Sequence, residues 1–183
     1  MTEFAKAYGG ALYALAQEEK LEDAILEQLQ AVCALLRENP DYVRLLESRN
    51  VPKAERVSLL DAAFGGQISA YLLNFMKILC ERGAFGQLSA CARAYEREYD
   101  EAHGILPATA VTASPMSEEQ KSRLIKALER RTGKTIRLST RVDETLMGGM
   151  RVEMQGMTLD NTVASRMDRL RRALLSQSGP LPF

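Results

Sequence analysis

Hydrophobic residues recur every three or four positions along roughly the first hundred residues, which is the spacing of one face of an α-helix. Six such runs follow one another, and proline or glycine residues that stop helices stand between most of them. The predicted helices lie at about 3–17, 21–37, 41–47, 52–64, 68–82 and 85–102. The fifth run, with Leu72, Phe75 and Met76 on one wide apolar face, is the most hydrophobic. We therefore expect an N-terminal six-helix bundle with the fifth helix at its centre.

Gly9 and Gly10 interrupt the first of these runs. A glycine inside a helix costs about 1 kcal/mol relative to alanine. The pair therefore predicts either a local weakness in the first helix or a place where another backbone approaches it closely.

The pattern changes near residue 104. The segment "ILPATAVTAS" alternates and is rich in Val and Thr, which favours a β-strand. A helix follows, beginning at a Ser-x-x-Gln capping box on Ser117 and ending at Gly133. A second alternating segment, "TIRLSTRVD", leads to a hairpin turning at Gln155-Gly156, with sharp-turn glycines at 148–149 before it. A final helix carries its apolar stripe at Val163, Met167, Leu170 and Leu174.

The chain is therefore predicted to be an α+β protein in two parts. Residues 1–104 form the N-terminal six-helix bundle, and residues 105–183 form a small mixed α/β C-terminal domain.

Composition narrows the classes of function. The 183 residues include 24 Lys+Arg and 24 Asp+Glu, whereas proteins that bind nucleic acid usually carry a basic excess. We therefore expect no nucleic-acid partner. No apolar run reaches the roughly 20 residues that span a bilayer, and the first residues do not resemble a signal peptide. We expect a cytosolic protein without direct membrane insertion.

Candidate chemistry is sparse. The segment "TGKT" at 132–135 resembles a phosphate-binding loop, but Leu128 stands where that motif needs glycine. Three widely spaced cysteines and the single His103 do not make a metal site. His103 is either an exposed junction residue or the base of a catalytic pair. The run Arg166, Arg169, Arg171 and Arg172 lacks the interleaved aromatic residues that stack on bases. The sequence therefore predicts no catalytic residue, no metal ligand and no cofactor.

Three segments together resemble a known family. They are "YGGALYALA" at 8–16, "NFMKILCERGAF" at 74–85 and "LMGGMRVEMQGMTLDNTVASRMDRLRRAL" at 146–174. In this order they resemble the delta subunit of F-type ATP synthases, the family that includes the oligomycin sensitivity-conferring protein. Asn161 and Ser165 stand where that family usually has glycine. Asparagine tolerates left-handed backbone geometry, so we expect the turn at Asn161 to survive.

The resemblance implies a non-catalytic stator subunit that joins the catalytic head to the peripheral stalk. It implies a peripheral location on the cytoplasmic face of the bacterial cell membrane. The N-terminal segment of an alpha subunit would bind a groove between the first and fifth helices, and the C-terminal region of the b subunits would bind the C-terminal domain. The groove residues carried over are Tyr8, Ala11, Leu12 and Ile78. Met150, Met154 and Met157 are either soft partner contacts or plain core.

Two other functions stay open at this point. One is a different helical adaptor or RNA-associated module, whose binding to nucleic acid would weaken as salt rises. The other is an enzyme with a site near His103.

Overall fold

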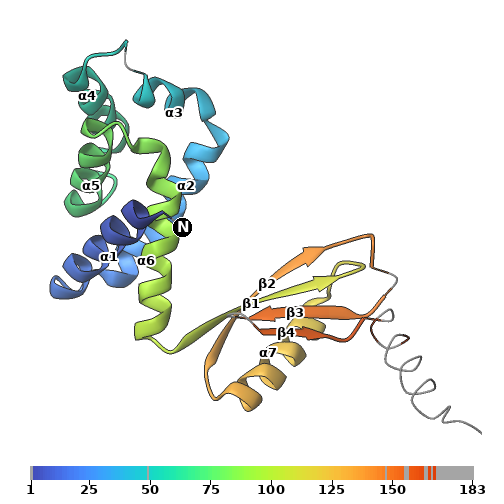
Figure 1. The fold of residues 1–183 in the computed structure, drawn as a ribbon. Helices are drawn as coiled ribbons and strands as arrows, with labels where there is room; N and C mark the ends of the chain where they lie inside the picture. The colour runs from blue at the N-terminus through green and yellow to red at the C-terminus, as the bar shows by residue number, and fades with distance from the viewer. Residues whose placement is uncertain are drawn as a thin grey trace, which may run out of the picture. The chain divides into compact units, whose positions relative to one another are not determined.

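The computed structural model describes residues 2–48, 50–146, 148–154, 157–162, 165 and 167, and contacts between Cα atoms divide the chain into two compact units. The first unit covers Met1–Tyr99 and the second covers Asp100–Phe183. Helices fill the first unit, and a sheet with a helix on it fills the second (Figure 1). The predicted α+β class, helical first and mixed afterwards, is confirmed.

The helical unit contains α1 to α6 and one short 3-10 helix, η1, among the residues that the structure describes. Their bounds are α1 Glu3–Glu18, α2 Glu22–Glu38, α3 Pro40–Glu47, α4 Lys53–Phe64, α5 Ala70–Glu81, η1 Phe85–Gln87 and α6 Leu88–Ala102. The predicted count of six is not exact, because the sequence pattern joined η1 to the sixth helix. A 3-10 turn shares the apolar spacing of the helix that follows it, so periodicity does not separate the two.

The core of the helical unit is apolar and built around α5. Met76 and Cys80 are fully buried, as predicted for the most hydrophobic helix. Tyr95 of α6 is also fully buried, packs edge-on against Tyr13 at 5.4 Å between ring centroids, and donates a hydrogen bond to the backbone oxygen of Glu22. This bond satisfies a phenol hydroxyl that would otherwise be costly to bury.

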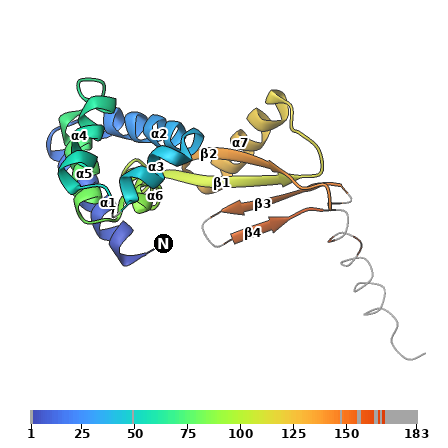
Figure 2. The same ribbon diagram turned by 90° about the horizontal axis from the view of Figure 1, so that it is seen from above.

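The second unit is a four-stranded sheet in the order β2-β1-β3-β4 within the described residues, and α7 packs on one of its faces (Figure 2). The elements are β1 Ile105–Thr112, α7 Glu118–Thr132, β2 Thr135–Val142, β3 Met150–Met154 and β4 Met157–Asp160. β1 and β2 are parallel, while β3 is antiparallel to both β1 and β4. The core lies between sheet and helix, where Leu128 meets Ile136 and Val152.

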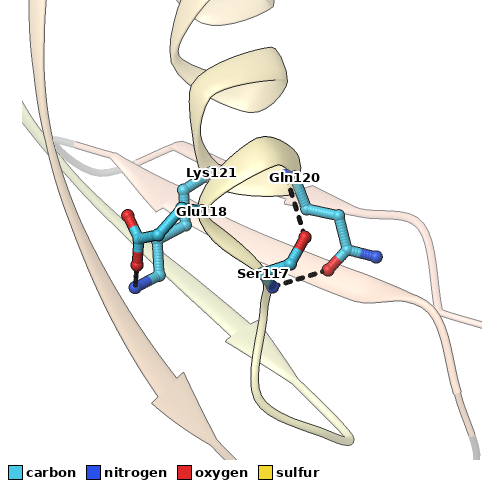
Figure 3. A network of polar contacts seen from close by, with 4 residues as sticks. All are labelled: Ser117, Glu118, Gln120 and Lys121. Atoms are coloured by element: carbon cyan, nitrogen blue, oxygen red, sulfur yellow. Dashed lines mark hydrogen bonds and ion pairs between the residues drawn. The ribbon is translucent and has the colours of Figure 1, made fainter.

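The predicted capping box begins α7 (Figure 3). The Ser117 hydroxyl accepts a hydrogen bond from the backbone N–H of Gln120, and the Gln120 side chain accepts one from the backbone N–H of Ser117. Lys121 pairs with Glu118 at 2.7 Å on the exposed side of the same turn. Gly133 ends the helix with a left-handed φ of 68°, as predicted for a helix stop.

The last predicted helix lies almost entirely outside the described residues, and so does the turn at Gln155-Gly156. Of its predicted stripe, the structure describes Met167, which is exposed. The hairpin itself is observed, because β3 and β4 pair in antiparallel register from Arg151 opposite Asp160 to Met154 opposite Met157.

Gly9 and Gly10 have different surroundings although they are neighbours in α1. A Cβ atom at Gly9 would lie 2.5 Å from the backbone oxygen of Cys91 and 2.6 Å from the Cβ of Ala94, both on α6. A Cβ atom at Gly10 would have nothing within 4 Å. Of the two explanations that the sequence left open, close approach of a backbone therefore applies to Gly9.

We expect Gly9→Ala to destabilise the protein by about 1–3 kcal/mol, because the added methyl group overpacks the contact between α1 and α6. Gly10→Ala is the matched control, and it should stabilise the protein by about 0.5–1 kcal/mol through helix propensity. Urea unfolding followed by circular dichroism measures both. Equal effects of the two substitutions would contradict the close approach at Gly9.

Candidate partner-binding groove

Two helices present the same pattern of side chains to each other. α1 contributes positions 8, 11, 12 and 15, and α5 contributes positions 71, 74, 75 and 78, so each helix uses the i, i+3, i+4, i+7 spacing of one face. Between them lies a groove of about 310 Å³. We call it the α1/α5 groove, and its lining is Tyr8, Ala11, Leu12, Leu15, Tyr71, Asn74, Phe75 and Ile78.

The groove has an apolar floor and partly exposed walls. Leu12 and Phe75 form the floor, with 3% and 7% of their surface exposed. Leu15 and Ile78 stand on the walls with 37% and 44% exposed, which is high for large aliphatic side chains. This arrangement leaves apolar surface open on a helical face, as in sites that bind the apolar side of an amphipathic helix.

The two ends of the groove carry opposite charge. At one end, the guanidinium carbon of Arg82 lies 5.6 Å from the centroid of the Tyr8 ring, and Phe4 stacks on the same ring at 4.1 Å. At the other end, a hydrogen bond with the Glu19 carboxylate raises the pKa of Tyr71, because the neutral phenol donates this bond and loses it on ionisation. The groove therefore has a positively charged end near Tyr8 and a negatively charged end near Tyr71.

The four residues predicted from the sequence, Tyr8, Ala11, Leu12 and Ile78, all line this one groove. Their role in binding a partner stays a prediction. The other four lining residues were not predicted, although the spacing of Leu15 and Phe75 along their helices could have indicated them. The eight lining residues include no carboxylate, imidazole, thiol or amine, so the groove offers surface for binding and no acid–base pair.

The other candidate residues are scattered. His103 is exposed in the turn after α6. Cys80 and Cys91 are buried, and burial raises the pKa of Cys91 to about 11, which keeps its thiol protonated. No cluster of three or more His, Cys, Asp or Glu side chains is placed to hold a metal ion in the described part of the chain. Arg166, Arg169, Arg171 and Arg172 lie outside the described residues.

The three methionines differ in burial. Met154 is 4% exposed and belongs to the core between sheet and helix, and Met150 packs against the same core. Met157 is 61% exposed on β4. Of the two interpretations left open, plain core therefore describes Met154, and Met157 is the methionine whose surface is open to a partner. Among the described helices, none has the length and apolar character needed to cross a membrane.

The turn after β4 fits against the paired glycines. Gly148 and Gly149 have φ values of 127° and 83°, which confirms the predicted sharp turn. A Cβ atom on Gly149 would lie 2.5 Å from the backbone oxygen of Asn161. Asn161 itself does not have a positive φ; among the described non-glycine residues only Lys20 does. The turn therefore tolerates asparagine without the left-handed geometry that we had expected it to need.

Asp160 organises this turn through both oxygens of its carboxylate. Oδ1 accepts a hydrogen bond from the backbone N–H of Thr162 at 2.9 Å, and Oδ2 accepts one from the Ser165 hydroxyl at 2.7 Å. The backbone bond from Thr162 is the largest cause of a pKa lowered from 3.8 to about 2, because each bond favours the charged form. Its contribution to stability is present above the unfolded pKa and is lost as pH falls through the folded one.

We expect the Asp160 carboxyl to titrate near pH 2 in an NMR experiment on the full chain. Ser165→Ala should raise that pKa towards 3.8, because it removes the bond to Oδ2. Ser122→Ala, an exposed serine on α7, should leave it unchanged. An Asp160 that titrates at its ordinary value in the wild-type chain would contradict these hydrogen bonds.

Comparison with known proteins gives a consistent result. A family model described as ATP synthase delta (OSCP) subunit matches residues 4–174. ATP synthase subunit delta of Rhodopirellula baltica is 36% identical over 170 residues, which are 92% of this chain and 74% of that protein. The same subunit of Desulfitobacterium hafniense strain DCB-2 is 33% identical over 93% of this chain and 95% of its own.

The fold also matches a solved structure. A chain of the Toxoplasma gondii mitochondrial ATP synthase hexamer superposes with a TM-score of 0.74. The match covers 98% of this chain and 100% of that chain at 22% sequence identity. At this identity the likeness shows a shared fold.

Proposed function

The chain belongs to the ATP synthase delta (OSCP) subunit family, as its sequence resemblance predicted, and on that premise we propose that it is a non-catalytic stator subunit. In this role it joins the catalytic head of an F-type ATP synthase to the peripheral stalk. Rotation of the central shaft exerts torque on the head, and the stator holds the head still so that ion flow is coupled to ATP synthesis. That role needs tight binding surfaces and no chemistry.

The proposed contact with the catalytic head is made through the α1/α5 groove. Its open apolar walls fit the apolar face of an amphipathic helix, with anchors spaced at i, i+3, i+4 and i+7. The proposed occupant is the N-terminal segment of an alpha subunit. Burial of side chains such as Ile78 supplies most of the free energy of binding, since apolar area removed from water contributes about 25 cal/mol per Å².

The proposed contact with the peripheral stalk is made through the C-terminal unit. β4 is an edge strand of the sheet, and Met157 on it is exposed. Soft, unbranched methionine side chains adapt to a partner surface. We assign this edge to the C-terminal region of the b subunits, with the whole protein held at the cytoplasmic face of a bacterial membrane through its partners.

The groove is tested by titrating the full chain with a peptide of the alpha-subunit N-terminus in a calorimeter. Ile78→Asp should weaken binding at least about tenfold, because it places a charge in the apolar contact. Ile78 is a better choice than Leu12, which is buried in the core and whose replacement by Asp would unfold the bundle.

The matched control is Leu35→Asp, which replaces a half-exposed leucine on α2 outside the groove and should bind like the wild type. Saturable one-to-one binding that both variants keep equally would rule out the groove as the docking site. Absence of peptide binding by the folded wild type, together with salt-sensitive RNA binding, would favour the adaptor alternative.

The stalk surface is tested by co-purification with the soluble part of the b subunit. Met157→Glu should reduce the retained amount severalfold, because a charge replaces an apolar contact at the strand edge. Val142→Glu, at the exposed end of the opposite edge strand β2, is the control and should leave retention unchanged. The assignment to β4 fails if Val142→Glu alone reduces retention.

A further inference from the structure

A second cavity lies in the helical unit, away from the lining of the α1/α5 groove. It has a volume of about 520 Å³ and is lined where α3 and α5 end and α4 begins. The lining consists of Glu47, Val51, Pro52, Lys53, Arg56, Glu81, Arg82 and Gly83. Figure 1 shows α4 beside α5, with α3 leading towards α4 through the preceding loop. We call this space the α4 cavity.

Arg56 is the unusual member of this lining. Its residue surface is 5% exposed, which is rare for arginine. Nη1 donates a hydrogen bond of 2.9 Å to the backbone oxygen of Leu46, and the Cys80 thiol points to the same oxygen at 3.8 Å. Nε is buried without a hydrogen-bond partner in the described part of the chain.

A buried guanidinium without a carboxylate partner is costly. No ion pair of Arg56 is observed within the described residues. A buried charge is normally paired, and an unpaired donor loses the hydrogen bonds that it makes in water. The backbone oxygen of Leu46 satisfies one of five N–H groups and supplies no negative charge. Arg56 therefore has a buried donor, Nε–H, for which the described residues supply no acceptor.

The start of α4 offers further donors to the same space. The backbone N–H of Arg56 donates the first backbone hydrogen bond of the helix, to the backbone oxygen of Pro52. The N-cap position is Pro52, whose side chain makes no capping bond, so the helix begins without a cap. The N–H groups of the first turn and the partial positive charge of a helix start favour an anion there.

The charges of the lining decide which anion fits. Three basic side chains stand against two acidic ones, an excess of one positive charge. The two acids point to a single negative charge, because they repel a doubly charged phosphate. The Glu47 carboxylate is already turned over the backbone of Gly86. The Arg82 guanidinium reaches the Tyr8 ring and so borders the groove as well.

We propose that the α4 cavity is a docking site for an acidic side chain, a Glu or Asp carboxylate presented by a partner polypeptide. The carboxylate accepts hydrogen bonds from Arg56 and from the first turn of α4, with Lys53 as a second positive charge at the rim. Val51 and Pro52 pack against the stem of the incoming side chain. This site goes beyond the groove and does not depend on what occupies it.

The test is an NMR titration of the full chain that follows the Nε–H signal of Arg56 and the backbone amides of α4. The probe is glutamate blocked as N-acetyl methylamide, and blocked glutamine is the uncharged match. We expect blocked glutamate to shift these signals in a saturable way and blocked glutamine to leave them in place. Inorganic phosphate, added separately, should bind more weakly than blocked glutamate.

Variants separate binding from folding. Lys53→Ala, at an exposed position, should weaken binding of blocked glutamate about two- to fivefold, the usual effect of one exposed charge, while Lys126→Ala on α7 should leave it unchanged. Arg56→Lys keeps the charge but removes Nε–H, and it should abolish the shift at the first turn of α4. If Arg56→Lys fails to fold, the comparison of Lys53→Ala with Lys126→Ala tests the site, and equal binding of blocked glutamate by these two variants would contradict it.

Three outcomes would overturn the proposal. They are equal shifts with glutamate and glutamine, an absence of shifts with both, and tighter binding of phosphate than of glutamate. The last would mean that the site recognises a free oxyanion and not a partner's side chain.

Discussion

The contact of α1 with α6 at Gly9 sets the arrangement of the helical unit. With no side chain at this position, the backbone of α6 comes within a distance that even one methyl group would block. This contact fixes the rotation of α1 about its own axis. Roughly a quarter turn further around the same helix, Tyr8, Leu12 and Leu15 then face α5 and make one wall of the groove. The open groove thus depends on a buried contact on another face of the helix.

Much of this fold could be predicted from periodicity. Apolar residues repeat every 3.6 positions along a helical face and every 2 positions along a strand, and both repeats are visible in the sequence. The bounds predicted for α2, α5 and the start of α7 are therefore close to the observed ones. What periodicity does not carry is which helices become neighbours. Tyr71 and Asn74 were missed for that reason, because each looks like an ordinary half-exposed or exposed position until α1 and α5 are placed side by side.

Arg56 illustrates the same limit more sharply. In the sequence it is one more charged residue on a short helix of weak apolar pattern, and such residues are normally solvated. Its burial arises from the meeting of three helix ends, and its backbone partner on α3 is ten positions away. Met154 and Met157 show the complementary case. Their residue type suggests either core or contact. The two residues are directly opposite each other on one face of the sheet, and they differ in burial because Met154 is on the inner strand β3 and Met157 is on the edge strand β4.

The topology of the sheet has a consequence for the order in which the protein is made. β1 lies inside the sheet, between β2 and β3, yet it is the first strand to leave the ribosome. Its parallel partner begins thirty residues later, at Thr135 opposite Ile105, and its antiparallel partner later still. The helical unit precedes the sheet in the chain, and the domains of a growing chain generally fold in order from the N-terminus. The newly made chain therefore carries, for a time, a finished bundle followed by a strand whose apolar residues and backbone donors have no partner, the interval in which such a chain depends most on chaperones.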